Sequence, residues 1–307
     1  MFIEICNRKI NTNTKKIDFS NNNLSIIPDK IKECTNLQIF YINENNFTNI
    51  DIISEMKSLV TLDISYCNIS NIISICKLAN LKYLFLNGNN ISEIPSIFSE
   101  LQNLKELYLN YNIISLIPDA ICQLFNLEKI ILSFNVIKSI PESINNLKKL
   151  ENLNLSNNEI IIVPNSLYCL ENLKILNLSS NNINIIPESL GNLTKLTKLN
   201  INNNKIVSIP HSIGNLIKII SLEIQENQIT ELPISIINLK KLNLFSYHNN
   251  PMENTHRLVR NFIGKILDKH KMKNLNSTYT DKQNVHTSSI QDSVKDSIIK
   301  ILSIKFN

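Results

Sequence analysis

The sequence contains no tryptophan and only four glycines among its 307 residues. The glycines, at positions 88, 191, 214 and 264, are too far apart for a G-x-G-x-x-G or P-loop phosphate-binding motif. No H-E-x-x-H pair occurs, and the five histidines are scattered without the spacing of metal ligands. The sequence therefore offers no catalytic motif, and we expect neither enzymatic activity nor a cofactor or metal.

Other absences concern the compartment. None of the six cysteines forms a C-x-x-C pair, so we expect reduced, buried thiols in a reducing environment. No stretch approaches the ~18 uninterrupted apolar residues of a membrane-spanning helix. The N-terminal segment contains Glu4 and lacks the long apolar run of a signal peptide. These features favour an intracellular, most simply cytoplasmic, protein without a membrane span.

The net charge of +5 is concentrated at one end of the chain. Residues 253–307 contain ten Lys and Arg against five Asp and Glu, which leaves 21 against 21 in residues 1–252. Because the basic residues do not form a run, we expect this tail to be solvated and consider nucleic-acid binding unfavoured.

What the sequence has in excess is isoleucine, leucine and asparagine in a repeating pattern. The stretch 150–164 reads LENLNLSNNEIIIVP, in which Leu150, Leu153 and Leu155 are followed by Asn158 and Pro164. The same pattern recurs with a spacing of 22, 22 and then seven times 23 residues, and a first, degenerate copy begins at Thr14. This makes eleven copies, of which the last ten have their first apolar residue at Leu37, Leu59, Leu81, Leu104, Leu127, Leu150, Leu173, Leu196, Ile219 and Leu242.

Each part of the pattern has a physical role. The L-x-x-L-x-L segment predicts a short strand with alternate side chains in the core. The Ile-Pro pair ends regular hydrogen bonding, because proline has no N–H, and the following x-x-I-x-x-L spacing suits a short helical or 3₁₀ turn. One copy cannot bury its apolar side alone, whereas stacked copies can. The sequence therefore predicts an α/β solenoid with a parallel sheet on its inner side.

A column of asparagines recurs once in almost every copy. A buried amide side chain can satisfy backbone N–H and C=O groups that lack partners at a tight turn, so we predict a structural asparagine ladder. The third copy carries Cys67 at this position, and copies two and three also lack the proline and one residue, so these should be the least regular. The ladder consists of Asn22, Asn45, Asn89, Asn112, Asn135, Asn158, Asn181, Asn204, Asn227 and Asn250.

The L-x-x-L-x-L-x-x-N units with I-P-x-x-I-x-x-L resemble those of intracellular leucine-rich repeat proteins of the Ras-suppressor-like group. The 22-residue copies at 37–80 are similar to the phosphatase-regulator type. The resemblance covers about four fifths of the chain. It implies a horseshoe with short 3₁₀ or helical convex segments and a non-catalytic role in protein–protein interaction.

The repeats at 14–252 divide the chain into four parts. We expect residues 1–13 to form an N-terminal cap. Residues 253–271 have apolar residues at helical spacing and should form a capping helix over the last repeat. Residues 272–307 are expected to form a flexible linker and an amphipathic helix near their end.

The variable positions of the strands should face the concave side, where the first half of the array is aromatic and the second half is rich in Asn and Ser. Seven aromatic side chains there could bury on the order of 1,000 Å², because each can bury 150–250 Å². Such patches are typical of binding sites, although aromatic residues also suit strands and could simply cover one another. The predicted partner-binding residues are Tyr41, Tyr66, Tyr83, Phe85, Tyr108, Tyr111, Ile131 and Phe134.

The sequence is compatible with three functions. The first is a monomeric scaffold that binds an unidentified protein through its concave face. The second is a regulatory subunit in a phosphatase or small-GTPase pathway, which the repeat type allows. The third is attachment of the basic tail to nucleic acid or an acidic membrane surface.

Overall fold

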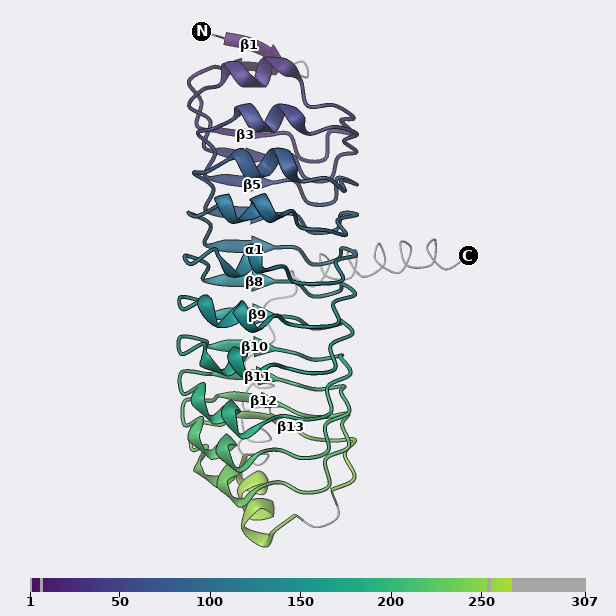
Figure 1. Cartoon of the computed structure of the whole chain (residues 1–307), viewed down its shortest axis with the longest axis vertical. Coiled ribbons are helices and arrows are strands. Elements are labelled where there is room, and N and C mark those ends of the chain that lie inside the picture. Colours follow the sequence, from purple (N-terminus) through teal and green to yellow (C-terminus); the bar gives the residue numbers. More distant parts are fainter. Residues whose placement is uncertain (1, 6–7, 253–254, 267–307) are drawn as a thin grey trace, which may run out of the picture. The chain divides into compact units, whose positions relative to one another are not determined.

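The computed structural model describes residues 2–5, 8–252 and 255–266 (Figure 1). Residues up to 262 form one compact unit, and residues 263–266 belong to a second. The predicted linker and second helix at 272–307, and the last residues of the predicted capping helix, lie outside the described residues. No helix in the described part of the chain is long and apolar enough to cross a membrane.

Within the first unit, the described residues form one eleven-stranded parallel sheet whose strands follow in sequence order (Figure 1). The central residue of each three-residue strand is a buried apolar side chain. Strands pair without a register shift, so each residue lies beside its counterpart 22 or 23 residues further along. The strands are β3 (Lys16–Asp18), β4 (Ile39–Tyr41), β5 (Thr61–Asp63), β6 (Tyr83–Phe85), β7 (Glu106–Tyr108), β8 (Lys129–Ile131), β9 (Asn152–Asn154), β10 (Ile175–Asn177), β11 (Lys198–Asn200), β12 (Ser221–Glu223) and β13 (Leu244–Ser246).

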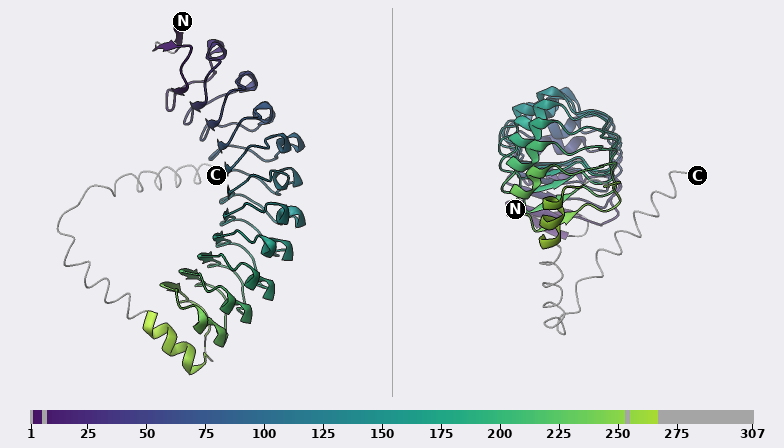
Figure 2. Two further views of the ribbon diagram at one scale, coloured as in Figure 1. Left: turned by 90° about the vertical axis from the view of Figure 1, so that its left-hand side faces the viewer. Right: turned by 90° about the horizontal axis from the view of Figure 1, so that it is seen from below.

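Short helical turns follow the strands on the outer side of the curved array, while the strands line its inner side (Figure 2). The leucine-rich repeat solenoid expected from the sequence is thereby confirmed. All but one of these turns are 3₁₀ helices. They are η1 (Asp29–Glu33), η2 (Asp51–Glu55), η3 (Ile73–Lys77), η4 (Ser96–Glu100), α1 (Asp119–Cys122), η5 (Glu142–Asn146), η6 (Asn165–Cys169), η7 (Glu188–Asn192), η8 (His211–Asn215) and η9 (Ile234–Asn238).

Copies two and three depart from this regular geometry. A proline with extended backbone, such as Pro164 with φ −69° and ψ 151°, precedes the other turns. Before η2 and η3 the residues are Ile50 and Ile72, with φ near −120° and ψ of 15° and 12°. The irregularity follows from the missing proline and the missing residue, as the sequence predicts.

Nine of the ten predicted asparagines, from Asn45 to Asn250, form a hydrogen-bonded ladder. The prediction is wrong for Asn22, whose Nδ2 donates to the Ser20 carbonyl of its own turn and whose Oδ1 accepts from Arg8, because no repeat precedes the first copy.

Asn158 is buried, and its Nδ2 donates to the carbonyl oxygens of Leu132 at 3.0 Å and Leu155 at 3.1 Å. Its Oδ1 accepts the backbone N–H of Ile137 at 3.0 Å. Each ladder residue of this kind therefore ties its own turn to the preceding coil.

Cys67 replaces only part of this pattern. Its Sγ lies 3.1 Å from the carbonyl oxygen of Ile42 and 3.3 Å from that of Ser65, so it can donate as the asparagines do. A thiol has no amide oxygen to accept a backbone N–H strongly, and it is a weaker donor than an amide.

The expectation that all cysteines are buried is wrong for Cys169. Cys34, Cys67, Cys76 and Cys122 are free and buried, whereas Cys169 is free and exposed at the end of η6. Its neighbour Tyr168 takes the buried position of that turn, which leaves Cys169 on the outer face. Burial raises the pKa of the Cys67 and Cys76 thiols to about 11. Cys6 lies outside the described residues.

Both ends of the array carry additional elements. At the N-terminal end, β1 (Phe2–Ile5) and β2 (Arg8–Asn11) form an antiparallel pair with Ile3 and Ile5 buried. After the last strand, residues 257–266 are helical, and Val259 is buried. The capping roles of residues 1–13 and 253–271 stay predictions.

Candidate protein-binding site

The predicted partner-binding residues occupy three rows along the inner side of the sheet. Tyr83 begins a strand, and Tyr41, Phe85, Tyr108 and Ile131 end one. The third row lies in the turn after the strand and contains Tyr66, Tyr111 and Phe134. These residues come from five consecutive coils, and they lie side by side because the strands pair in register. We call them together the aromatic patch.

Stacking between rings covers part of this patch. Phe85 and Tyr108 stack with ring centroids 4.6 Å apart, and Tyr111 and Phe134 stack at 4.4 Å. Tyr66 and Phe134 remain 42% and 41% exposed, while the other members are half-buried. The area that each ring offers to a partner is therefore smaller than the 150–250 Å² that an aromatic side chain can bury in full.

The turn row has an unusual backbone conformation. Tyr66, Tyr111 and Phe134 have φ of 56°, 57° and 57°. This left-handed region is disfavoured for bulky side chains by roughly 1–2 kcal/mol. The same position is left-handed in every coil, and in the second half of the array it holds Asn157, Ser180, Asn203, Glu226 and Asn249. Asparagine tolerates this conformation best. The aromatic residues of this row therefore share a turn geometry that belongs to the repeat, and differ from the later coils in the size of the side chain.

Gly88 makes room for one of these rings. Its φ is 62°, and a Cβ atom added there would lie 2.2 Å from two carbon atoms of the Tyr66 ring. The ring of Tyr66 thus lies across the backbone of the next coil, toward the side of Tyr111. Glycine adopts this left-handed conformation without a steric cost, and the close approach of the Tyr66 ring leaves no room for a Cβ atom.

Charged groups hold the central stack in place. The hydroxyl of Tyr108 donates to Oε2 of Glu106 at 2.6 Å, and Nζ of Lys129 lies 4.8 Å from the centroid of the Tyr108 ring. Burial, together with the Glu106 carboxylate, raises the pKa of Tyr108. The ring is thus fixed from both sides, which reduces the conformational entropy that a partner would have to remove.

Sequence reasoning missed one residue in this region. Asp63 ends β5, between Tyr41 on β4 and Phe85 on β6. Burial raises the pKa of its carboxyl group, in spite of the hydrogen bond from the backbone N–H of Ser65 at 3.0 Å. The nearby charge of Asp18 raises this pKa further. The repeat spacing alone aligns Asp63 with Tyr41 and Phe85 at the ends of consecutive strands. An acid between two aromatic residues was the sequence feature that could have identified it.

Asp63→Asn is expected to stabilise the fold at neutral pH. A carboxyl group with a raised pKa in the folded state contributes stability below its unfolded pKa of about 3.9 and loses it as the pH rises through the folded value. Denaturant unfolding of both forms between pH 4 and pH 8 measures this. The gain of the variant should be largest at pH 8 and shrink on acidification, and a variant that is less stable at pH 8 would contradict the assignment.

The polar half of the concave face is internally hydrogen-bonded. The Oδ1 atoms of Asn154 and Asn177 accept the backbone N–H of Ser156 and Ser179, each at 3.0 Å. Nδ2 of Asn200 donates to Oε2 of Glu223 at 3.1 Å. These side chains support their own turns, so this half offers less unsatisfied surface than the aromatic half.

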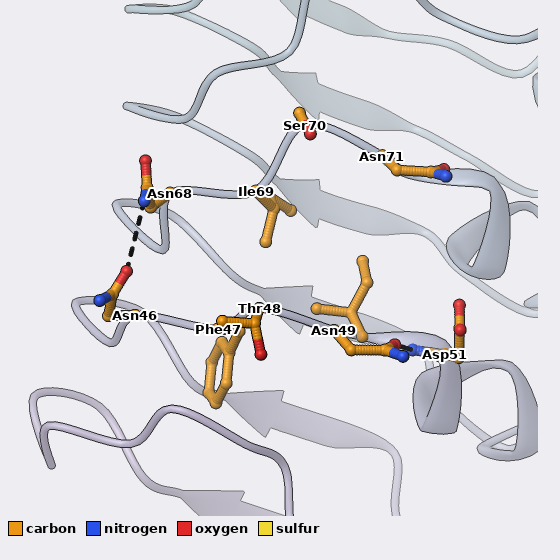
Figure 3. Close-up of a pocket in the computed structure, with 10 residues that line it drawn as sticks. Asn46, Phe47, Thr48, Asn49, Asp51, Asn68, Ile69, Ser70 and Asn71 are labelled. Atoms are coloured by element: carbon orange, nitrogen blue, oxygen red, sulfur yellow. Dashed lines mark hydrogen bonds between the residues drawn. The ribbon is translucent and has the colours of Figure 1, made fainter.

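A separate cavity of about 500 Å³ lies away from the aromatic patch, between the loops of copies two and three (Figure 3). Its lining is mostly amide and hydroxyl groups, and Asn68 Nδ2 donates across it to Asn46 Oδ1 at 3.4 Å. The cavity coincides with the turns that lack proline. We attribute it to this irregularity of the stacking, because no member of the aromatic patch lines it.

Comparison with known proteins agrees with the repeat geometry. A family model described as a leucine-rich repeat region matches residues 36–182 and 162–305, and one described as Leucine Rich Repeat matches residues 13–34. The chain therefore belongs to the leucine-rich repeat family. A comparison with curated protein sequences gives no match.

Solved structures provide relatives of the fold. The chain is similar to a leucine-rich repeat protein of Leptospira interrogans, with 30% identity, 84% of this chain and 71% of that chain covered, and a TM-score of 0.69. An internalin from Listeria monocytogenes has 25% identity, with 75% and 66% covered and a TM-score of 0.67. The plant peptide hormone receptor RGFR1, in complex with RGF2, has 25% identity, with 73% and 46% covered and a TM-score of 0.50. This chain spans less than half of that receptor structure.

Proposed function

We propose that the chain is a non-enzymatic scaffold that binds a protein partner through the aromatic patch of its concave face. The observation that carries the proposal is the placement of Tyr66, Tyr111 and Phe134 at left-handed backbone positions. The left-handed turn itself recurs in every coil and elsewhere holds residues such as Glu44, Ser180 and Glu226. What distinguishes these three coils is a large, partly exposed ring at that position, which the turn does not need for folding.

Composition and rigidity support the same surface. Tyrosine is enriched in binding hot spots, and a standard interface needs about 800 Å² from each partner. The two stacked ring pairs order the side chains before binding, which lowers the entropic cost of association. One of the similar structures is a plant peptide hormone receptor in complex with RGF2, which supports a peptide or protein ligand for this chain.

The test is a double substitution in the centre of the patch. Phe85→Ala combined with Tyr108→Ala removes the stacked pair and should weaken partner binding at least ~100-fold, since two hot-spot residues contribute about 2 kcal/mol or more each. The partner is first isolated by affinity purification with the wild-type chain. Its affinity for wild-type and variant proteins is then measured by titration.

A matched control lies outside the concave face. Ile161 and Ile162 are 53% and 72% exposed, so replacing both with alanine removes comparable apolar surface elsewhere. The control should bind as the wild type does. Full binding by a folded Phe85/Tyr108 variant would refute the assignment of the patch.

The regulatory-subunit and tail-attachment hypotheses stay predictions. The former requires copurification of a phosphatase or small GTPase. The latter concerns residues outside those described, and it requires binding that weakens steeply with salt.

A further inference from the structure

We propose that the concave face recognises a lysine or arginine side chain of its protein partner at Asp63, between the aromatic rings of Tyr41 and Phe85. This inference rests on the function proposed above and specifies the chemistry of the partner. We refer to the three residues as the Asp63 site.

The sheet register defines the geometry of the site. Tyr41, Asp63 and Phe85 are direct neighbours on three consecutive strands. Adjacent strands lie about 4.8 Å apart, so the two aromatic positions are separated by roughly 10 Å with the carboxylate between them. A space of this width, with an acidic floor and aromatic walls, matches a cationic group.

The outer sides of both walls are already occupied. Tyr108 from β7 stacks on Phe85 at 4.6 Å, and Nζ of Lys16 from β3 lies 4.9 Å from the centroid of the Tyr41 ring. Both neighbours come from coils that lie away from β5. The remaining face of each ring is therefore directed toward the strand that carries Asp63.

Asp63 has no positively charged partner in the described part of the chain. The three ion pairs found there join Lys105 to Glu128, Lys129 to Glu106, and Lys174 to Glu151. The charged group whose field acts on Asp63 is another acid, Asp18. A half-buried carboxylate without a cation is unfavourable, and an incoming ammonium or guanidinium group would relieve this.

The chain itself shows that the rings of this face attract cations. Lys16 lies over Tyr41, and Lys129 lies over Tyr108 at 4.8 Å. Cation–π contacts of this type are stronger when the cation is withdrawn from water, as it would be beneath a bound partner.

The carboxylate is not needed for the fold at this position. Asn154, Asn177 and Asn200 occupy the equivalent position in later coils and accept the same backbone hydrogen bond, at 3.0 to 3.1 Å. An asparagine would serve the turn without a buried charge.

In the first coil Asp18 accepts the same bond from Ser20. The charges of Lys16 and Arg8 balance that of Asp18, whereas no such cation in the described part of the chain acts on Asp63. The unbalanced acid at position 63 therefore points to a ligand of opposite charge.

Neighbouring groups extend the negative potential of the site. Glu44 and Asp63 both act on the phenol of Tyr66, whose pKa is raised by burial and further by Tyr111 and these acids. Glu44 takes part in none of the ion pairs in the described part of the chain. A cation at Asp63 would thus be attracted by two carboxylates and bordered by three aromatic side chains.

The test uses the full chain labelled with 3-fluorotyrosine. The sequence has eight tyrosines, so ¹⁹F NMR gives few signals, and Tyr41→Phe and Tyr66→Phe assign two of them. The probes are N-acetyl-lysine amide and N-acetyl-arginine amide, with N-acetyl-norleucine amide as the neutral control. We expect the Tyr41 and Tyr66 signals to shift and saturate with a cationic probe only.

Asp63→Asn should weaken this binding at least ~10-fold, because it removes a charge-assisted interaction. The matched control is Asn154→Asp, which places a carboxylate on the polar half and should leave the shifts at Tyr41 and Tyr66 unchanged. Equal shifts with the norleucine probe, or an unchanged affinity in a folded Asp63→Asn variant, would overturn the proposal.

The outcome is separable from that of the proposed function. If Phe85→Ala with Tyr108→Ala abolishes binding of the natural partner while Asp63→Asn leaves it intact, the concave site stands and the recognition of a cation fails. If Asp63→Asn weakens both the probe and the natural partner, the inference holds.

Discussion

Asn158→Ala is expected to lower the free energy of unfolding by about 3 kcal/mol, since burial without hydrogen-bond partners costs roughly 1–3 kcal/mol for each polar group. The substitution leaves the carbonyl groups of Leu132 and Leu155 and the N–H of Ile137 without the amide that now satisfies them. Chemical denaturation of the full chain measures the loss.

Cys67→Ala provides the matched comparison. The thiol makes only weak contacts with two carbonyl oxygens, at 3.1 and 3.3 Å, so its removal should lower the stability by about 1 kcal/mol. If Asn158→Ala and Cys67→Ala lower the stability equally, the hydrogen bonds of the amide do not explain the role of the asparagine in the turn.

Gly88→Ala is expected to lower the stability by about 2 kcal/mol and to displace the ring of Tyr66. The left-handed φ of 62° disfavours any side chain by 1–2 kcal/mol. In addition, the new Cβ would overlap the ring, since two of its atoms would lie 2.2 Å away. Denaturant unfolding measures the first effect, and a shift of the Tyr66 signal in ¹⁹F NMR reports the second.

A double-mutant cycle separates backbone strain from ring overlap. In a Tyr66→Ala background there is no ring to overlap with the new Cβ. Gly88→Ala should then lower the free energy of unfolding only by the cost of the left-handed φ. Gly264→Ala is a control for a methyl group without steric overlap, because no atom of the described residues outside its own helix lies within 4 Å of the added Cβ. It should not lower the stability, since alanine favours the helix over glycine. An identical loss in both backgrounds would mean that the ring does not constrain Gly88.

The sequence predicted the repeat scaffold well because each coil solves the same physical problem. Leu153, Asn158 and Pro164 recur at fixed spacing, and each position has one physical role. The sequence also predicted which copies depart from the regular repeat geometry, because Cys67 and the turns without proline interrupt the pattern there.

The site was less predictable, because its properties depend on pairs of residues from different coils. The periodicity placed Tyr66 on the concave side, but its position across Gly88 depends on the absence of a Cβ one coil further on. Similarly, Asp63 alone resembles a solvated surface acid. Its setting becomes apparent only when the register places it between Tyr41 and Phe85. The exposure of Cys169 was missed because the periodicity of η6 does not reveal which of two adjacent residues turns inward.

The unshifted register also affects how rapidly this chain can fold. The backbone hydrogen bond from the N–H of Leu155 to the carbonyl of Asn177 joins residues 22 positions apart. The hydrogen bond from the side-chain amide of Asn158 to the carbonyl of Leu132 joins residues 26 positions apart. A separation of 23 residues in a chain of 307 gives a relative contact order of about 0.07, within the range of rapidly folding helical bundles. Parallel sheets generally fold slowly, because distant strands must meet before they pair. Here each new coil closes one short loop, so a nucleus formed anywhere in the array can grow in both directions.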